Sequence, residues 1–172
     1  ELSRHSDHHF KASKHYQILD SCEESPQMPT GYPGMMIFAL ISPIWFWYMN
    51  KKVNEIKKDA TRAGVREAIY KTRVDTSKAR SNWQVSVGIE NSRKREAFFK
   101  GKGGSTRGPS SDAAYKFAKW EIGKAKSEQA LYITNPQDYV ADKLDPLDWM
   151  VQNAVIEIEY KISKKASSLR IY

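Results

Sequence analysis

Three histidines near the start of the chain have the type and spacing of metal ligands. On a helix, the i, i+3 and i+4 spacing of His5, His8 and His9 places them on one face. Neutral imidazoles so arranged suit iron or zinc, and Asp7 could orient one ring from outside the coordination shell. An exposed polar segment is the alternative, and spacing alone leaves the two equally open. The single cysteine, Cys22, excludes an internal disulfide and a Cys-rich zinc site.

A second set of candidate residues is basic. Residues 51–111 contain 16 basic and 6 acidic residues, a net charge of +10, whereas the whole chain carries +8. This excess favours a nearby polyanion, although a solvated basic face would have the same composition. The Gly-rich stretch 101–109 is expected to be a mobile loop that contacts DNA backbone or a neighbouring subunit. It is not a Walker loop, because no strand leads into it. The candidate contact residues are Lys102 and Arg107, followed by Arg93, Lys94 and Arg95.

The segments that would position these residues indicate an α+β fold. Charged helical periodicity predicts a helix over residues 51–72, and the short polar residues 75–77 favour a turn. Residues 83–90 alternate with period two, which is typical of a half-buried strand with Trp83 on the buried face. We expect Trp83 to anchor this sheet face to the second helix.

Two further elements complete the expected sheet layer. A second helix is predicted over 112–129, with Ser110 or Ser111 as its cap, and a short strand over 131–133. Residues 149–160 fit a helix and a strand equally well. We therefore expect an antiparallel sheet packed with an N-terminal helix and a second helix. A helix carrying the histidines and a short apolar, membrane-type helix would precede this arrangement.

The apolar run over residues 35–49 is too short to cross a bilayer. At about 1.5 Å per residue, a helix of this length falls well short of the ~30 Å hydrocarbon core. Pro43 should kink or split it, and the aromatic residues and lysines near its end are typical of an interface. We interpret it as a helix lying on a membrane surface or against partners absent from this chain.

Residues 2–52 resemble the C-terminal end of the membrane-bound alkane hydroxylases, or alkane 1-monooxygenases. The resemblance rests on Arg-His-Ser-Asp-His-His at residues 4–9, then Tyr-Gln, and then a Pro-x-Gly-Tyr motif before an apolar segment with Pro-x-Trp. It implies that His5, His8 and His9 belong to the family's last histidine box, which ligates a di-iron centre. The other boxes have no counterpart here, and three imidazoles cannot hold two irons. We therefore expect no cofactor in the isolated chain, and iron only where the missing part is supplied.

Residues 53–160 resemble the small neck, or tail-completion, proteins of tailed bacteriophages. The resemblance rests on Val-Asp-Thr-small-basic-x-Arg-x-x-Trp at residues 74–83, on the run "LYITNPQDYVADKLD", and on the order of the elements. The family's usual proline and glycine are replaced by Arg73 and Ser77, which leaves the turn less rigid. The resemblance implies a ring of identical subunits at the head–tail junction that meets the tail and head-closure proteins.

These observations predict a chimeric chain. Residues 1–50 would be a non-catalytic remnant of an alkane hydroxylase, and residues 51–172 a structural neck-type domain without catalytic residues. The location would be the virion or the host cytoplasm, with residues 35–49 at a membrane surface. One alternative is a fragment of a membrane-bound alkane 1-monooxygenase, which would need its missing part and a rubredoxin-type electron donor. Another is a generic basic DNA-binding domain.

Overall fold

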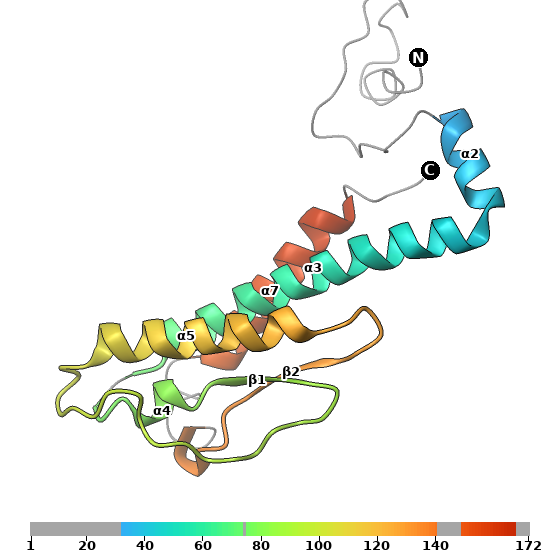
Figure 1. Ribbon diagram of the computed structural model, residues 1–172. Coiled ribbons are helices and arrows are strands. Elements are labelled where there is room, and N and C mark those ends of the chain that lie inside the picture. The colour runs from blue at the N-terminus through green and yellow to red at the C-terminus, as the bar shows by residue number, and fades with distance from the viewer. Residues whose placement is uncertain (1–31, 74, 141–148, 168–172) are drawn as a thin grey trace, which may run out of the picture. The chain divides into compact units, whose positions relative to one another are not determined.

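The computed structural model describes residues 32–73, 75–140 and 149–167 (Figure 1). These residues divide between two compact units. One, the sheet unit, comprises the described part of residues 53–162. The other contains the described residues before 53 and after 162. The predicted histidine helix lies outside the described residues.

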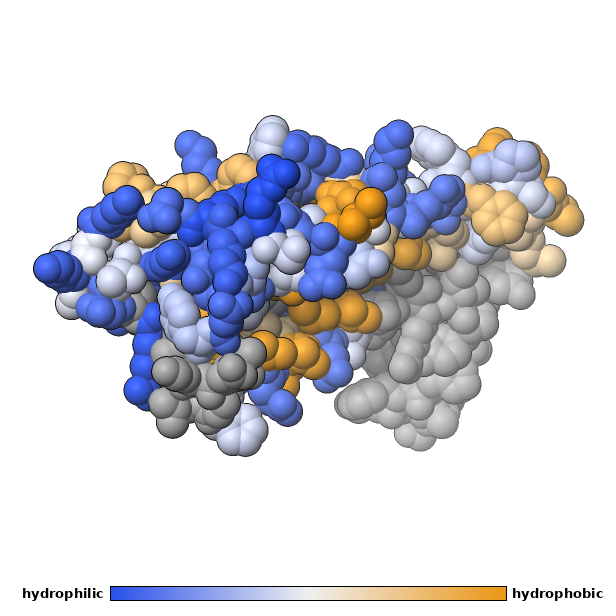
Figure 2. Space-filling view, turned by 90° about the horizontal axis from the view of Figure 1, so that it is seen from below, coloured by the Kyte–Doolittle hydropathy of each residue, from blue (hydrophilic) through white to orange (hydrophobic). Residues whose placement is uncertain are grey.

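The apolar run folds as helix α2, Tyr32–Leu40, followed by the first turns of helix α3, Ser42–Lys71. The predicted split is confirmed: the break falls at Ile41, two residues before Pro43. Proline is tolerated there because the N–H groups of a helix's first turn have no partner within the helix. Most of the large hydrophobic side chains of α2 and of the first turns of α3 are exposed. Figure 2 shows hydrophobic residues of this segment in orange at the right-hand end of the view. In the described part of the chain, no helix is long and apolar enough to cross a membrane.

Helix α3 begins nine residues before the start predicted at residue 51, so that boundary was wrong. The apolar and charged segments form one continuous helix. Cation–π pairs cross the expected boundary: Lys51 and Lys52 each place their Nζ 5.8 Å from the ring of Trp47 and Tyr48, respectively, one turn earlier. Such i, i+4 pairs stabilise a helix through the point where its composition changes.

The ambiguous segment near the C-terminus is a helix, α7, Met150–Ser167. Met150 and Ala154 are buried, and Ile158, on the same face, meets α3 at Gly64. A Cβ at Gly64 would meet the side chain of Ile158, so the glycine lets the two helices approach closely here, and a larger residue would force Ile158 to shift. The local alternation that suggested a strand is overridden by this packing against α3.

The two strands form one antiparallel sheet, and helix α5, Arg107–Lys124, lies between them in the sequence. Strands β1, Gln84–Val87, and β2, Leu131–Thr134, pair with Gln84 opposite Thr134 and Val87 opposite Leu131. The second strand is as predicted, apart from one extra residue. The first is shorter than expected, because Gly88 turns the chain with a φ of 81° and Ile89 is exposed beyond it.

Both faces of β1 are covered at its start, which corrects the prediction of a half-buried strand. Gln84 is fully buried although it lies on the face expected to be polar and open. The segment 91–95 covers that face. Gln84 donates its side-chain amide to Arg93 O, and Asn82 both donates to Arg95 O and accepts from Arg95 N. Side-chain amides thus supply hydrogen bonds that a neighbouring strand would normally give.

Helix α5 spans Arg107–Lys124, about five residues earlier than the predicted 112–129. Ser110 and Ser111 are therefore buried inside its first turns and do not cap it. Ser111 Oγ donates to Arg107 O within the helix, and Ser110 Oγ donates to Phe99 O. Tertiary hydrogen bonds thus satisfy the serines that favoured a later start.

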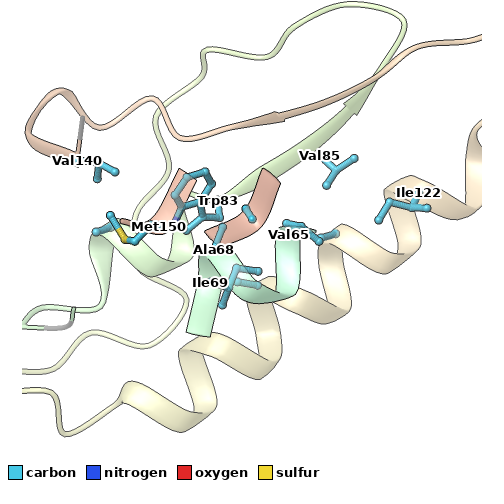
Figure 3. Packing of buried hydrophobic residues seen from close by; sticks show 12 residues of the cluster. Val65, Ala68, Ile69, Trp83, Val85, Ile122, Val140 and Met150 are labelled. Carbon is cyan, nitrogen blue, oxygen red and sulfur yellow. The ribbon is translucent and has the colours of Figure 1, made fainter. Parts of the chain in front are cut away.

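The sheet unit has one main hydrophobic core (Figure 3). Its buried residues come from α3, the short helix α4 (Lys78–Ser81), β1, α5 and α7. Trp83 is 5% exposed and lies among Met150, Ala68 and Ile69 in Figure 3. Its indole N–H donates to Thr72 Oγ1 at 2.7 Å, so it ties the start of the sheet to the end of α3. Its predicted anchoring to the second helix stays a prediction. The apolar stripe of α5 and its C-cap face this core, because Ala114, Ala118, Ile122 and Ala125 are buried.

Candidate functional site

The turn between α3 and β1 is built around a buried arginine. Arg80 is 2% exposed and makes four hydrogen bonds: two to Thr72 O, one to Tyr70 O and one to Ser111 Oγ. Two of its three acceptors are carbonyls at the C-terminal end of α3, where a helix leaves carbonyls unpaired and a cation is favourable. Burial, and then the nearby charge of Arg107, lower the pKa of Arg80 to about 10, so it remains charged at neutral pH.

The same turn holds the Gly-rich loop in place. Asp75 accepts from Gly103 N through its carboxylate and from Gly104 N through its main-chain oxygen, both at 3.0 Å. Ser77 and Thr106 share a hydrogen bond of 2.8 Å between their hydroxyls. Ser77 has a φ of 63°, the left-handed conformation that favours glycine. The stretch predicted to be a free loop is thus attached to the turn at three points.

The predicted contact residues do not form one cluster. Lys102 and Arg107 are exposed at the start of α5, on the side of the Asp75 turn. Lys94 pairs with Asp138 at 2.6 Å, which neutralises it locally. Arg93 is exposed, and Arg95 is partly buried with its guanidinium 4.1 Å from the ring centre of Phe117.

Arg95 belongs to a groove that the sequence did not reveal. The hollow has a volume of about 360 Å³ and lies along β1 and the end of α5. Lys124 and Lys126 line it together with Arg95. These lysines were missed because the segment after residue 111 has no net charge. The available signal was the position of Lys124 and Lys126 near the C-terminal end of the second helix, which brings two basic side chains to one place.

The histidines of the predicted metal site lie outside the described residues. Among residues 32–73, 75–140 and 149–167, no group of three or more His, Cys, Asp or Glu side chains could hold a metal ion. The sheet unit therefore offers no metal centre in its described part. The metal-ligand role of His5, His8 and His9 stays a prediction.

Comparison with known proteins identifies relatives of one segment. The chain is 54% identical over 52 residues to alkane 1-monooxygenase 1 of Pseudomonas aeruginosa and 53% identical over 53 residues to alkane 1-monooxygenase 2 of Alcanivorax borkumensis. It is 42% identical over 66 residues to the alkane 1-monooxygenase of Acinetobacter baylyi.

The match is short relative to the enzymes themselves. It covers 30–38% of this chain and 14–16% of the length of these three relatives. No family model and no solved structure matches the chain. The resemblance to alkane 1-monooxygenases is thus supported for a partial segment. Nothing in these comparisons supports the resemblance of residues 53–160 to phage neck proteins.

Proposed function

We propose that this chain carries the terminal histidine-box segment of a membrane-bound alkane 1-monooxygenase. The identity of 54% over 52 residues carries the proposal, because an identity this high over a whole segment reflects more than composition. The finding favours the enzyme-fragment interpretation over a purely structural role for these residues. The activity would require the remainder of such an enzyme, because the chain spans only 14–16% of the relatives' length.

In this function the three histidines supply imidazole nitrogens to a di-iron centre. The i, i+3 and i+4 spacing of His5, His8 and His9 lets one helix face present three neutral ligands together. Asp7, between them in sequence, is suited to accept an N–H from one ring and so fix its orientation. The iron would supply the oxygen chemistry when bound. No residue of the sheet unit is assigned to it.

A segment exchange tests the proposal. Residues 1–52 would replace the corresponding segment of the Pseudomonas aeruginosa enzyme, and alkane hydroxylation and membrane iron content would be measured. We expect the exchanged enzyme to remain active, and the change of His5, His8 and His9 together to alanine to lower activity roughly a hundredfold or more. His15→Ala is the matched control and should leave activity unchanged. An inactive exchange that is expressed at normal levels would refute the proposal.

A second candidate function concerns the sheet unit, which we propose as a structural connector at the head–tail junction of a virion. The proposal rests on the resemblance of residues 74–83 to neck proteins, and three residues of that motif build the fold. Asp75 holds the Gly-rich loop, Arg80 closes the end of α3, and Trp83 fills the core. The proposed role is a homo-oligomeric ring with its basic residues toward the DNA channel.

Assembly state and DNA retention distinguish this role from that of a generic DNA-binding domain. Light scattering after size-exclusion chromatography should show a ring of discrete mass in the absence of DNA. DNA retention should fall with salt regardless of sequence, because phosphate neutralisation releases counterions. Lys102→Ala with Arg107→Ala should weaken retention. A monomer that binds DNA tightly would support the generic domain instead, and unchanged retention in the double variant would remove these two residues from the interface.

A further inference from the structure

Three aromatic side chains lie next to one another outside the buried stripe of α5. The ring centres of Phe98 and Phe117 are 6.4 Å apart, and those of Phe117 and Trp120 are 5.7 Å apart. We call these three side chains the aromatic platform. Trp120 is 59% exposed and Phe98 is 39% exposed, whereas such large rings usually fill a core or an interface. Much of the ring surface of the platform is therefore open to a ligand.

The platform is built on main chain that is already held in place. Phe98 N donates to Ser81 Oγ at 3.1 Å, and the next carbonyl, Phe99 O, accepts from Ser110 Oγ at 3.1 Å in the first turns of α5. The other two rings are three residues apart on α5, so they lie on neighbouring turns of one face. Because the spacing of the rings exists before binding, a ligand does not lose affinity to ordering them.

Cations accompany the rings of the platform. The guanidinium of Arg95 lies 4.1 Å from the ring centre of Phe117, and the ammonium of Lys124 lies 3.1 Å from that of Trp120. Residues 93–124, which supply the whole platform, contain nine basic and three acidic residues. A ligand that contacts the rings thus also meets an excess of positive charge, which favours an anion with flat, polarisable groups.

We propose that the aromatic platform is a binding site for single-stranded nucleic acid. The bases stack on the exposed rings of Phe98 and Trp120, and the site tolerates any sequence because every base has a π face. The phosphates meet Lys116 and Lys124, which lie one helical turn to either side of Trp120 and are both exposed. The proposal does not depend on either function proposed above, since the connector role concerns duplex DNA and other residues.

Two other partners fit the platform less well. A DNA duplex would satisfy the cations, but its base faces are covered by neighbouring base pairs, so the exposed rings would gain no stacking. A membrane surface attracts aromatic residues and cations together, but it requires a continuous apolar helix face. The positions one turn from Trp120 on the open side of α5 include Lys116, Gly123 and Lys124, which form no such face.

Oligonucleotide binding to the full-length chain tests the proposal. The probe is a fluorescein-labelled oligothymidylate of roughly twelve nucleotides, and its binding is followed by fluorescence anisotropy. It is compared with an abasic strand of the same length, which keeps the phosphates and lacks the bases, and with a duplex of the same length. We expect the oligothymidylate to bind roughly tenfold more tightly than either competitor, because only its bases are free to stack on the rings.

Two tryptophan variants locate the site. Trp120→Ala should weaken binding of the oligothymidylate roughly tenfold, because it removes the most exposed ring of the platform. Trp149→Ala is the matched control, since Trp149 is 62% exposed and lies just before α7. It should leave binding unchanged, and circular dichroism should show both variants folded. Lys116→Gln should lower the slope of log affinity against log salt by about 0.7, the value for one phosphate contact on a single strand.

Three results would overturn the proposal. Equal binding of the abasic strand or the duplex would mean that phosphates alone are recognised. Equal losses in Trp120→Ala and Trp149→Ala would place the site elsewhere. No binding of the oligothymidylate would mean that the rings serve only to pack against their own cations, or, where Trp120→Ala abolishes binding to anionic lipid vesicles, that the platform meets a lipid surface.

Discussion

Replacing Arg80 tests the buried turn most severely. Arg80→Met removes the guanidinium and leaves Tyr70 O, Thr72 O and Ser111 Oγ without their donor. Each orphaned buried acceptor costs about 1–3 kcal/mol, and removal of a buried charge recovers part of that sum. We therefore expect a net loss of about 3–5 kcal/mol, less than the full sum for three orphaned acceptors. Arg80→Lys keeps the charge but has no planar fork, so we expect an intermediate loss of about 1–3 kcal/mol.

Urea unfolding followed by circular dichroism measures these losses. Arg93→Met is the matched control, because Arg93 is exposed and its side chain should contribute within about 0.5 kcal/mol. The Arg80→Met loss should stay constant between pH 5 and 8, since the pKa of Arg80 is about 10. A loss no larger than that of Arg93→Met would refute the role of Arg80 at the end of α3.

The other predictions concern the core and one titrating pair. Trp83→Ala should cost about 3–5 kcal/mol in urea unfolding, as for other buried aromatic residues, and an unchanged midpoint would mean that Trp83 faces an interface. Gly64→Ala should destabilise by about 1–3 kcal/mol because its Cβ would meet Ile158, and Ile158→Ala should suppress that loss in a double-mutant cycle; additivity would contradict the contact. Tyr70 donates to Asp112 Oδ1, which raises the pKa of the tyrosine. The stability it contributes should be complete below pH ~10 and lost as pH rises through the raised pKa. Melting of Tyr70→Phe from pH 8 to 12 tests this, and a constant difference from the wild type would contradict it.

Local sequence patterns predicted which helices and strands form better than they predicted the residues at which these begin and end. The second strand and the stripe of α5 follow from periodicity alone, because each has one face against the core. The start of α5 does not follow from periodicity, because serines before an apolar stripe are typical helix caps. In the structure the hydroxyls of Ser110 and Ser111 instead donate to Phe99 O and Arg107 O. Helix α7 was undecided for a similar reason: the contact of Ile158 with Gly64, far away in sequence, selects the helix.

In the candidate sites, too, the sequence predicted what depends on local spacing and missed what depends on contacts between distant residues. The turn motif identified Asp75 and Trp83 as important residues, but not that Arg80 would bond the end of α3. The groove along β1 depends on Lys124 and Lys126 reaching the same hollow as Arg95, which no local pattern encodes. The histidine box stands out in the sequence because ligand spacing on one helix is a local property.

We propose that the sheet unit folds independently of the segment that is similar to alkane 1-monooxygenases. The most direct test is the thermal unfolding of residues 53–172 alone, compared with the full chain. We predict a cooperative transition with an unchanged midpoint and improved solubility, because the exposed apolar surface of α2 and early α3 is removed. Loss of cooperative unfolding in the shortened chain, under conditions where the full chain is folded, would contradict the claim.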